Sequence, residues 1–443
     1  MDKIRISDHF TYRRLILFAM PAIGMILITM TYDVIDGYFI SNYIGKTAFS
    51  AVNIIYPFQM ILSLVGYMFG AGGSALIAAE LGRGRQDTAN AIFTVIIRTC
   101  MVVSTVLMAA GIVALPLVSG FLGATPEIMK YGIPYGRILF LFLPAMTVGY
   151  AFQSLLITAE KPKLGFSISI LTLVSNLLFD YLFVVVFRWG MMGAAVATGI
   201  GASLNGLIPL IYFSRKNSSL LRFTRAKMDW KAVMSACSNG ASEMMANMSL
   251  SVIVILYNFQ LLRMIGVDGV AAFEIVFFVE GIFAAVFYGL AMETTSIVGY
   301  HYGAKNFAEL KSLLRKGILL NLTAGVLICL LCWLLAPFVA GLYVGYDVTV
   351  FKLSIHAMRL HSLAFLFMGF NEFVSAFFTG LNNGLVSGIL TFGRTFVLQM
   401  VCILVLPLLF GLNGLWMALP TGEMIACIPA IWFLIIKKRD YSG

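Results

Sequence analysis

The segment GKTAFSAVNIIYPFQMILSLVGY, residues 45–67, aligns without gaps to GVDGVAAFEIVFFVEGIFAAVFY, residues 266–288. The two segments lie 221 residues apart, and the same register continues to LGRGR at 81–85 and YGAKN at 302–306. Each segment is apolar over roughly the 20 residues that cross a bilayer as a helix. The sequence therefore predicts an internal duplication built from membrane-spanning helices.

The composition of the whole chain indicates a lipid environment. Of its 443 residues, 60% are hydrophobic and only 11% are charged, whereas roughly a quarter are charged in an average soluble domain. So few charged side chains cannot cover a soluble particle of this size. The composition excludes a soluble enzyme, a disordered protein and a nucleic-acid-binding protein.

Twelve apolar stretches are long enough to span a membrane. They lack the alternating pattern of an outer-membrane barrel, so the backbone hydrogen bonds must close within helices. We predict an all-α integral membrane protein with twelve transmembrane helices. The spans are expected at residues 15–40, 49–79, 91–117, 133–158, 164–187, 191–213, 232–262, 270–300, 313–343, 353–379, 385–410 and 412–436.

The duplication predicts two six-helix lobes, residues 1–213 and 232–443, joined by the basic cytoplasmic linker 214–231. An even number of helices in each copy gives both copies the same orientation, with an axis along the membrane normal. In transporters built from such repeats, the substrate and the coupling ions bind near the middle of the membrane.

The basic residues predict the orientation of the chain. About 21 Lys and Arg residues fall on the side of the two termini, and about seven on the opposite side. The positive-inside rule then places both termini in the cytoplasm. The net charge of +10 is explained by this bias, and the expected location is the cell (inner or plasma) membrane.

Ionisable side chains within the spans identify candidate machinery, because a charge inside a bilayer is costly and normally faces the protein interior. In the first half these residues are Asp33, Asp36 and Asp180, accompanied by Asn176 and the hydroxyl of Thr198. Such oxygen ligands suit either a proton or a hard cation such as Na⁺. The alternative is that Asp36 and Asp180 are helix-end residues in contact with outside water.

The second half carries more glutamates inside its spans. Glu243, Glu274, Glu280 and Glu372 are candidates for substrate binding or ion coupling, and Arg394 is a candidate counter-charge for one of them. This excess of carboxylates favours cationic organic substrates. Since no HExxH, P-loop or GxSxG motif is present, we do not expect an enzyme.

Pro21 lies in the first span, fifteen residues before Asp36. Proline removes a backbone hydrogen bond, so it is expected to kink the helix. The sequence leaves open whether this kink moves during a functional cycle or is static.

Several motifs together resemble the multidrug and toxic compound extrusion (MATE) family over nearly the whole chain. The resemblance is to its prokaryotic DinF-like branch or a related one, and implies two lobes forming a V, with drug efflux driven by inward flow of H⁺ or Na⁺. The motifs are YDVIDGYFISNYIG (32–45), AAELGRGR (78–85), SNLLFDYLF (175–183), WGMMGAAVATGIG (189–201), SNGASEMMANMS (238–249), GYHYGAKN (299–306) and FGRTFVLQM (392–400).

The resemblance also implies roles for particular residues. Family members of the DinF-like branch have an N-lobe cation site, and others use a glutamate near the position of Glu243. This chain has Ser242 where many relatives have proline, which weakens the alignment of that glutamate. The N-lobe site, and any bound Na⁺, would fall on Asp36, Asn176, Asp180 and Thr198.

The expected function is therefore a secondary antiporter that exports organic, often cationic, drug-like compounds in exchange for H⁺ or Na⁺. We expect no cofactor, membrane lipid as surroundings, no nucleic-acid partner and a monomer. The alternative is a flippase for lipid-linked precursors, from the same superfamily. Such proteins often carry a basic central cavity, whereas the deep charges here are mainly acidic.

Overall fold

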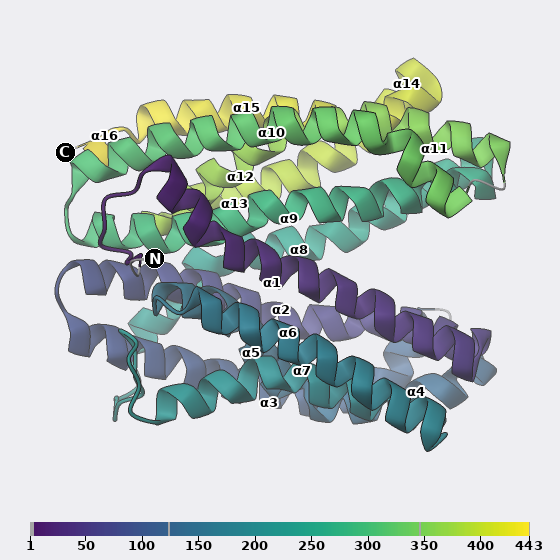
Figure 1. Cartoon of the computed structure of the whole chain (residues 1–443), viewed down its shortest axis with the longest axis horizontal. Helices are drawn as coiled ribbons and strands as arrows, with labels where there is room; N and C mark the ends of the chain where they lie inside the picture. The colour runs from purple at the N-terminus through teal and green to yellow at the C-terminus, as the bar shows by residue number, and fades with distance from the viewer. Residues whose placement is uncertain (1–3, 123–124, 345–346, 443) are drawn as a thin grey trace.

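The computed structural model describes residues 4–122, 125–344 and 347–442, and within these ranges the chain is almost entirely helical, without strands (Figure 1). Long helices run back and forth, and both termini lie at one end of the molecule. The first half contains α1 (Tyr12–Phe39), α2 (Lys46–Gly82), α3 (Gln86–Phe121), α4 (Pro126–Leu141), α5 (Leu143–Thr158), α6 (Pro162–Asp180) and α7 (Gly190–Ser214).

The second half repeats this pattern with more interruptions. It contains α8 (Trp230–Ile265), α9 (Val267–Gly303), α10 (Phe307–Val344), α11 (Val348–His361), α12 (Phe365–Gly380), α13 (Gly384–Phe392), α14 (Gln399–Trp416), α15 (Ala418–Ile436) and the short α16 (Arg439–Ser442). The prediction of twelve spans is confirmed. In the described residues, eleven segments are long and apolar enough to cross a membrane, and the bent pair α4–α5 supplies a twelfth.

The span predicted at residues 133–158 is broken rather than continuous. Its two parts, α4 and α5, meet at an angle of 59°. Pro144 lies in the first turn of α5, where its missing N–H is tolerated but cannot continue the hydrogen-bond ladder of α4. A sequence of uniform hydropathy therefore folds as two helices.

The internal repeat is present in the backbone itself. Helices α2 and α9 each have 37 residues, and both of their ends differ by the offset of 221 found in the sequence. The turns before them use Gly45 and Gly266, both with positive φ. The turns after them place Gly84 and Lys305 in the left-handed region, although that conformation is unfavourable for a residue with a side chain.

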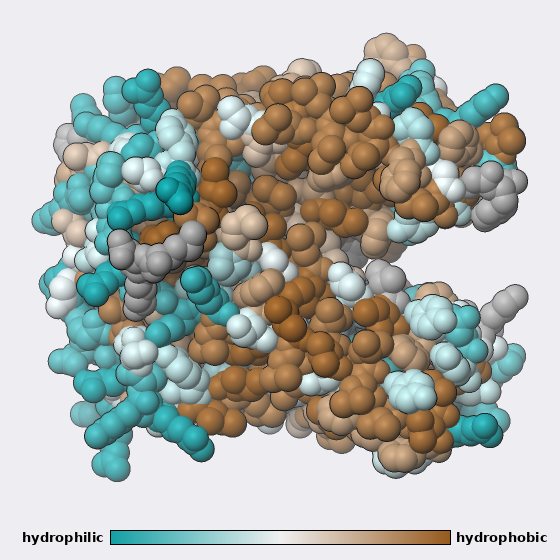
Figure 2. All heavy atoms as spheres, viewed as in Figure 1, coloured by the Kyte–Doolittle hydropathy of each residue, from teal (hydrophilic) through white to brown (hydrophobic). Residues whose placement is uncertain are grey.

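The two halves form a V. On the face shown in Figure 2, a broad apolar band lies beside a hydrophilic end at the termini, and a hollow separates the halves at the opposite end. Helix α1 crosses between the halves (Figure 1) and packs against α6 of its own half and α9 of the other. Helix α2 packs closely against α8 and α9, which closes the V at the end of the termini.

Glycines allow this closure, which we call the inter-half seam. A Cβ atom on Gly72 would lie 1.9 Å from the carbonyl oxygen of Ala236, and one on Gly240 would lie 1.9 Å from that of Met68. The repeat-related Gly82 and Gly303 show the same reciprocal contact: their Cβ atoms would lie 1.9 Å from the carbonyl oxygens of Tyr300 and Ala79. The helices therefore touch backbone to backbone.

Substitution of a seam glycine is expected to be destabilising. Gly72→Ala places a methyl group against a backbone oxygen that cannot rotate away, and overpacking of this kind costs about 1–3 kcal/mol. Gly388→Ala is the matched control, because a Cβ there meets nothing within 4 Å. Thermal unfolding in detergent should show a lower Tm for Gly72→Ala only; equal melting temperatures would contradict a tight seam.

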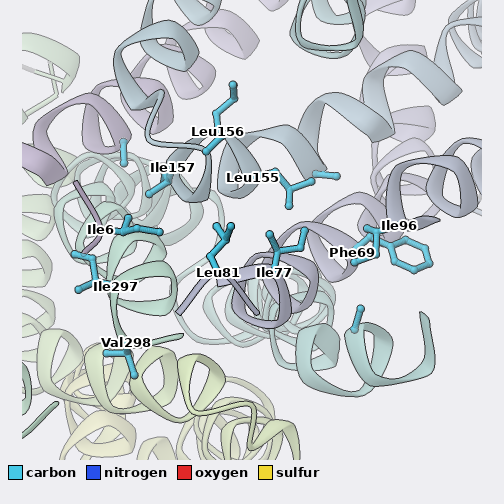
Figure 3. Packing of buried hydrophobic residues seen from close by; sticks show 14 of the residues in the cluster. Ile6, Phe69, Ile77, Leu81, Ile96, Leu155, Leu156, Ile157, Ile297 and Val298 are labelled. Atoms are coloured by element: carbon cyan, nitrogen blue, oxygen red, sulfur yellow. The ribbon is translucent and has the colours of Figure 1, made fainter. Parts of the chain in front are cut away.

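The N-terminal strap, residues 4–11, lies over the closed end and joins both halves. The backbone N–H of Ile6 donates to Glu160 Oε1 (3.1 Å) and that of Phe10 donates to Glu309 Oε1 (3.0 Å). Lys316 Nζ donates to the carbonyl oxygen of Phe10 (2.6 Å). The Ile6 side chain is fully buried in a cluster with residues of α2, α5 and α9 (Figure 3).

Candidate functional site

A cavity of about 880 Å³ lies between the two halves. Its volume is in the range of pockets that hold small organic molecules. Asp36 and Thr198 line it from the first half, and Glu243, Glu372 and Arg394 line it from the second. The structure thus brings candidate residues from both copies of the repeat to one space.

Asp36 is held at the cavity wall by helix α7. The Thr198 hydroxyl oxygen lies 2.7 Å from Asp36 Oδ1 and 2.9 Å from the carbonyl oxygen of Ala194, so its single proton is shared between two acceptors. Tyr32, one turn before Asp36 on α1, donates its hydroxyl to the carbonyl oxygen of Thr198 (2.9 Å). These contacts fix α1 against α7 beside the carboxyl group.

Asp180 and Asn176 lie behind Asp36 and do not line the cavity. Both are fully buried. The Asn176 amide and the two carboxyl groups lie close to one another, but the amide nitrogen and oxygen of Asn176 make no hydrogen bond among the described residues. In the described part of the chain, neither oxygen of Asp180 has a hydrogen-bond partner within normal distance. Buried carboxyl oxygens without a protein donor are satisfied by a proton, a cation or an ordered water, and a set of oxygen ligands suits a hard cation.

Short π-helical segments accompany the candidate residues. One, η1 (Ile40–Ile44), begins one turn after Asp36, and another, η2 (Tyr181–Val186), begins directly after Asp180. A third, η4 (Gly393–Leu398), contains Arg394. Such segments are rare and occur often at functional sites, because the wider turn displaces side chains from regular helical positions.

In the second half, Arg394 joins two glutamates. It forms ion pairs with Glu372 and with Glu423, the latter at 2.9 Å between Nη1 and Oε1. Asn371 Nδ2 donates to Glu423 Oε2 (2.8 Å). All three charged groups are buried and line the cavity. Glu423 was not predicted from the sequence. It carries the same signal as the predicted residues, because it is an ionisable residue within an apolar span.

The other glutamates have different surroundings. Glu280 lines the cavity and pairs with His361 Nε2 at 2.7 Å, a partner that the sequence did not indicate. Glu243 lines the cavity near Glu372 and Arg394, and its carboxyl oxygens have no hydrogen bond or ion pair within the described residues. Glu274 is exposed and does not line the cavity.

Two further predicted residues lie on α1. The side chain of Asp33 lies outside the described part of the structure. Helix α1 continues through Pro21 without interruption from Tyr12 to Phe39. A functional role for either residue therefore stays a prediction.

Two membrane-spanning helical halves around a shared cavity that contains buried charged groups define a multi-pass membrane transporter. The sequence profile of the MatE family matches residues 21–182 and 243–405, so the chain belongs to this family, whose members are transporters and not enzymes. The two matched ranges fall in the first and second halves.

Similar proteins match this chain over most or all of its length. "Multidrug export protein MepA" of Staphylococcus haemolyticus is 21% identical over 445 residues, covering 98% of this chain and 95% of that protein. "Probable multidrug resistance protein YoeA" of Bacillus subtilis is 23% identical over 382 residues, covering 84% and 81%. Among solved structures, the "outward-facing conformation of a multidrug resistance MATE family transporter of the MOP superfamily" has a TM-score of 0.91 at 20% identity, covering 100% and 99%.

Proposed function

We propose that the chain exports organic, often cationic, drug-like compounds in exchange for H⁺ or Na⁺. This proposal rests on one observation: Asp36 and the second-half carboxylates line the same cavity. It gives an organic molecule and a coupling ion access to a connected set of acidic groups. The names of the similar proteins MepA and YoeA support the class of substrate.

The charges of the cavity favour a cationic substrate. Arg394 is already matched by two carboxylates, Glu372 and Glu423, so this cluster carries an excess negative charge when both are ionised. Glu243 adds a carboxylate without a direct partner in the described residues. A cavity with this charge raises the local concentration of organic cations.

Tyrosines of the first half offer an aromatic surface to the cavity. The rings of Tyr67 and Tyr150 stack with centroids 4.7 Å apart, and both residues line the cavity. Aromatic faces attract cations and pack against planar apolar groups, and these contacts are compatible with substrates of different shapes. An amphipathic cation could therefore place its charge toward Glu243 and its apolar part toward these tyrosines.

In this proposal, the position of Asp36 between the cavity and Asp180 couples ion binding to substrate release. A proton or Na⁺ bound by Asp36, Asp180, Asn176 and Thr198 neutralises the carboxylate that faces the cavity. That change weakens the attraction for a cationic substrate, so ion entry favours substrate release. The ion and the substrate thereby bind in alternation, which is the requirement for exchange.

The coupling ion can be identified in proteoliposomes that contain the purified protein and a fluorescent organic cation. We expect a gradient of one ion, imposed alone, to drive accumulation of the dye, with no dye movement in protein-free vesicles. A Na⁺ gradient at equal pH and a pH gradient without Na⁺ separate the two ions. Failure of both gradients would overturn the antiport proposal.

A flippase for lipid-linked precursors is less consistent with the cavity. Recognition of a pyrophosphate group needs free cationic side chains, whereas the buried Arg394 is already bound by two glutamates. Tight binding of a lipid-linked sugar pyrophosphate by the purified protein would favour that alternative.

We further propose that the chain is a monomer in the cell membrane, with both termini in the cytoplasm and lobes at residues 1–213 and 232–443. The hollow of the V would then face outward. Lys227→Cys, at an exposed position in the linker, should react with a membrane-impermeant maleimide only after permeabilisation. Val348→Cys, exposed near the start of α11, should react in intact cells, and the reverse pattern would contradict this orientation.

A further inference from the structure

A second, much smaller cavity lies on the side of α9 away from the central one. It has a volume of about 20 Å³ and is enclosed by side chains of α1, α9, α10 and α12. Glu293 of α9 and Asn321 of α10 line it, and each is only 2% exposed. The other lining residues are mostly apolar and include Leu15 of α1 and Phe373 of α12.

Two buried oxygens in this cavity lack partners. Glu293 Oε1 and Asn321 Oδ1 have no hydrogen bond within the described residues. The Asn321 amide nitrogen donates to the carbonyl oxygen of Gly317 (2.9 Å), which leaves the amide oxygen as an acceptor facing the space. Buried polar atoms in folded proteins are nearly always satisfied, by protein or by ordered water.

A charged Glu293 would have no counter-ion at the cavity, since no described lining residue is Lys, Arg or His. Lys311 and Arg315 of α10 are exposed at the surface, and other charged groups on the surrounding helices have partners away from this cavity. Lys316 of α10 donates to the carbonyl oxygen of Phe10 and Arg14 of α1 to that of His9. On α12, Glu372 pairs with Arg394 in the central cavity, and His301 of α9 lies beside Asn306.

Burying an unpaired carboxylate costs several kcal/mol, and such a group normally takes up a proton instead. A protonated Glu293 is a donor as well as an acceptor. The cavity also has room for a water molecule, which needs roughly 10–15 Å³ by this measure. One water can bridge a carboxylic acid and an amide oxygen, and it satisfies both unpartnered atoms.

We propose that Glu293 and Asn321 form a second proton-binding site, which holds a proton on Glu293 and a water molecule beside it. Leu15 covers this site at the start of α1, directly after the N-terminal strap. Movement of α1 away from α9 removes that cover and exposes Glu293 toward the end of the termini. The role of this proton in export rests on the proposed antiport function, whereas its presence on Glu293 does not.

Infrared difference spectroscopy tests the protonation directly. The purified protein should show a carbonyl band of a protonated carboxylic acid that Glu293→Gln removes. Glutamine is a neutral isostere of the protonated acid, so this variant should keep its fold and melting temperature. Asn321→Ala, which removes a hydrogen-bond partner, should shift the band to higher frequency. Glu127→Gln, at an exposed position in the first turn of α4, should leave the band unchanged.

A pH-indicator dye in weak buffer tests the role in export. On addition of an organic cation, Glu293→Gln should release fewer protons than the wild-type protein, whereas Glu127→Gln should match the wild type. Identical carboxylic-acid carbonyl bands in Glu293→Gln and the wild type would overturn the site. Equal proton release would overturn its role in export. Asp36→Asn separates the proposed antiport function from the proposed proton site at Glu293, because this variant should stop export and retain the Glu293 band.

Discussion

Asp36→Asn is expected to reduce export of an organic cation from proteoliposomes to the level of protein-free vesicles. The substitution keeps the size and the hydrogen bond from Thr198 but removes the group that alternates between a charged and a neutralised state. Asn cannot bind a proton, and it offers a hard cation only a neutral oxygen. The central event of the proposed exchange is then lost.

Insertion and folding should survive this change. The melting temperature and elution profile of Asp36→Asn should match those of the wild type, because a neutral isostere removes a desolvation cost rather than adding one. Glu127→Gln serves as the transport control, since Glu127 is exposed and outside the cavity. Wild-type transport by Asp36→Asn would rule out Asp36 as the coupling group.

The second large effect is expected at Arg394. Arg394→Met leaves Glu372 and Glu423 in a buried site without their cation, and breaking a buried ion pair from one side costs about 3–5 kcal/mol. We expect a strongly lowered Tm in detergent and reduced protein yield.

A combined variant tests whether unpaired charge causes this loss of stability. It carries Arg394→Met, Glu372→Gln and Glu423→Gln. With the two carboxylates neutralised, no uncompensated charge remains, so most of the lost stability should return. Absence of rescue would show that Arg394 acts through its packing rather than its charge. Transport by the combined variant then reports separately whether these glutamates are needed for export.

The sequence predicted the helices well because hydropathy and length determine which segments can lie in lipid. The duplication was readable at an offset of 221 because glycines mark the same turns in both copies. The bend between α4 and α5 was not predicted. Its signal, Leu143 followed by Pro144, lies inside a stretch whose hydropathy does not change.

The site was predictable only in part. Asp36, Asn176, Asp180 and Thr198 come together as their positions on the first-half spans suggested. The pairing of Glu280 with His361, and of Arg394 with a second glutamate, depends on the packing of helices distant in sequence. The π-helical segments next to these residues leave no pattern that hydropathy can detect. The contacts of Gly72 and Gly240 across the inter-half seam were also not predictable, because they depend on how distant helices pack in the folded protein.

The N-terminal strap has a practical consequence for the length of the chain. A chain shortened to begin at α1 would lose Ile6 and Phe10, whose side chains are fully buried. It would also leave Glu160 and Glu309 without their backbone donors. Residues before a first membrane span are commonly treated as a dispensable tail, but tolerance to truncation depends on burial and hydrogen bonding. Here residues 4–11 belong to the folded body.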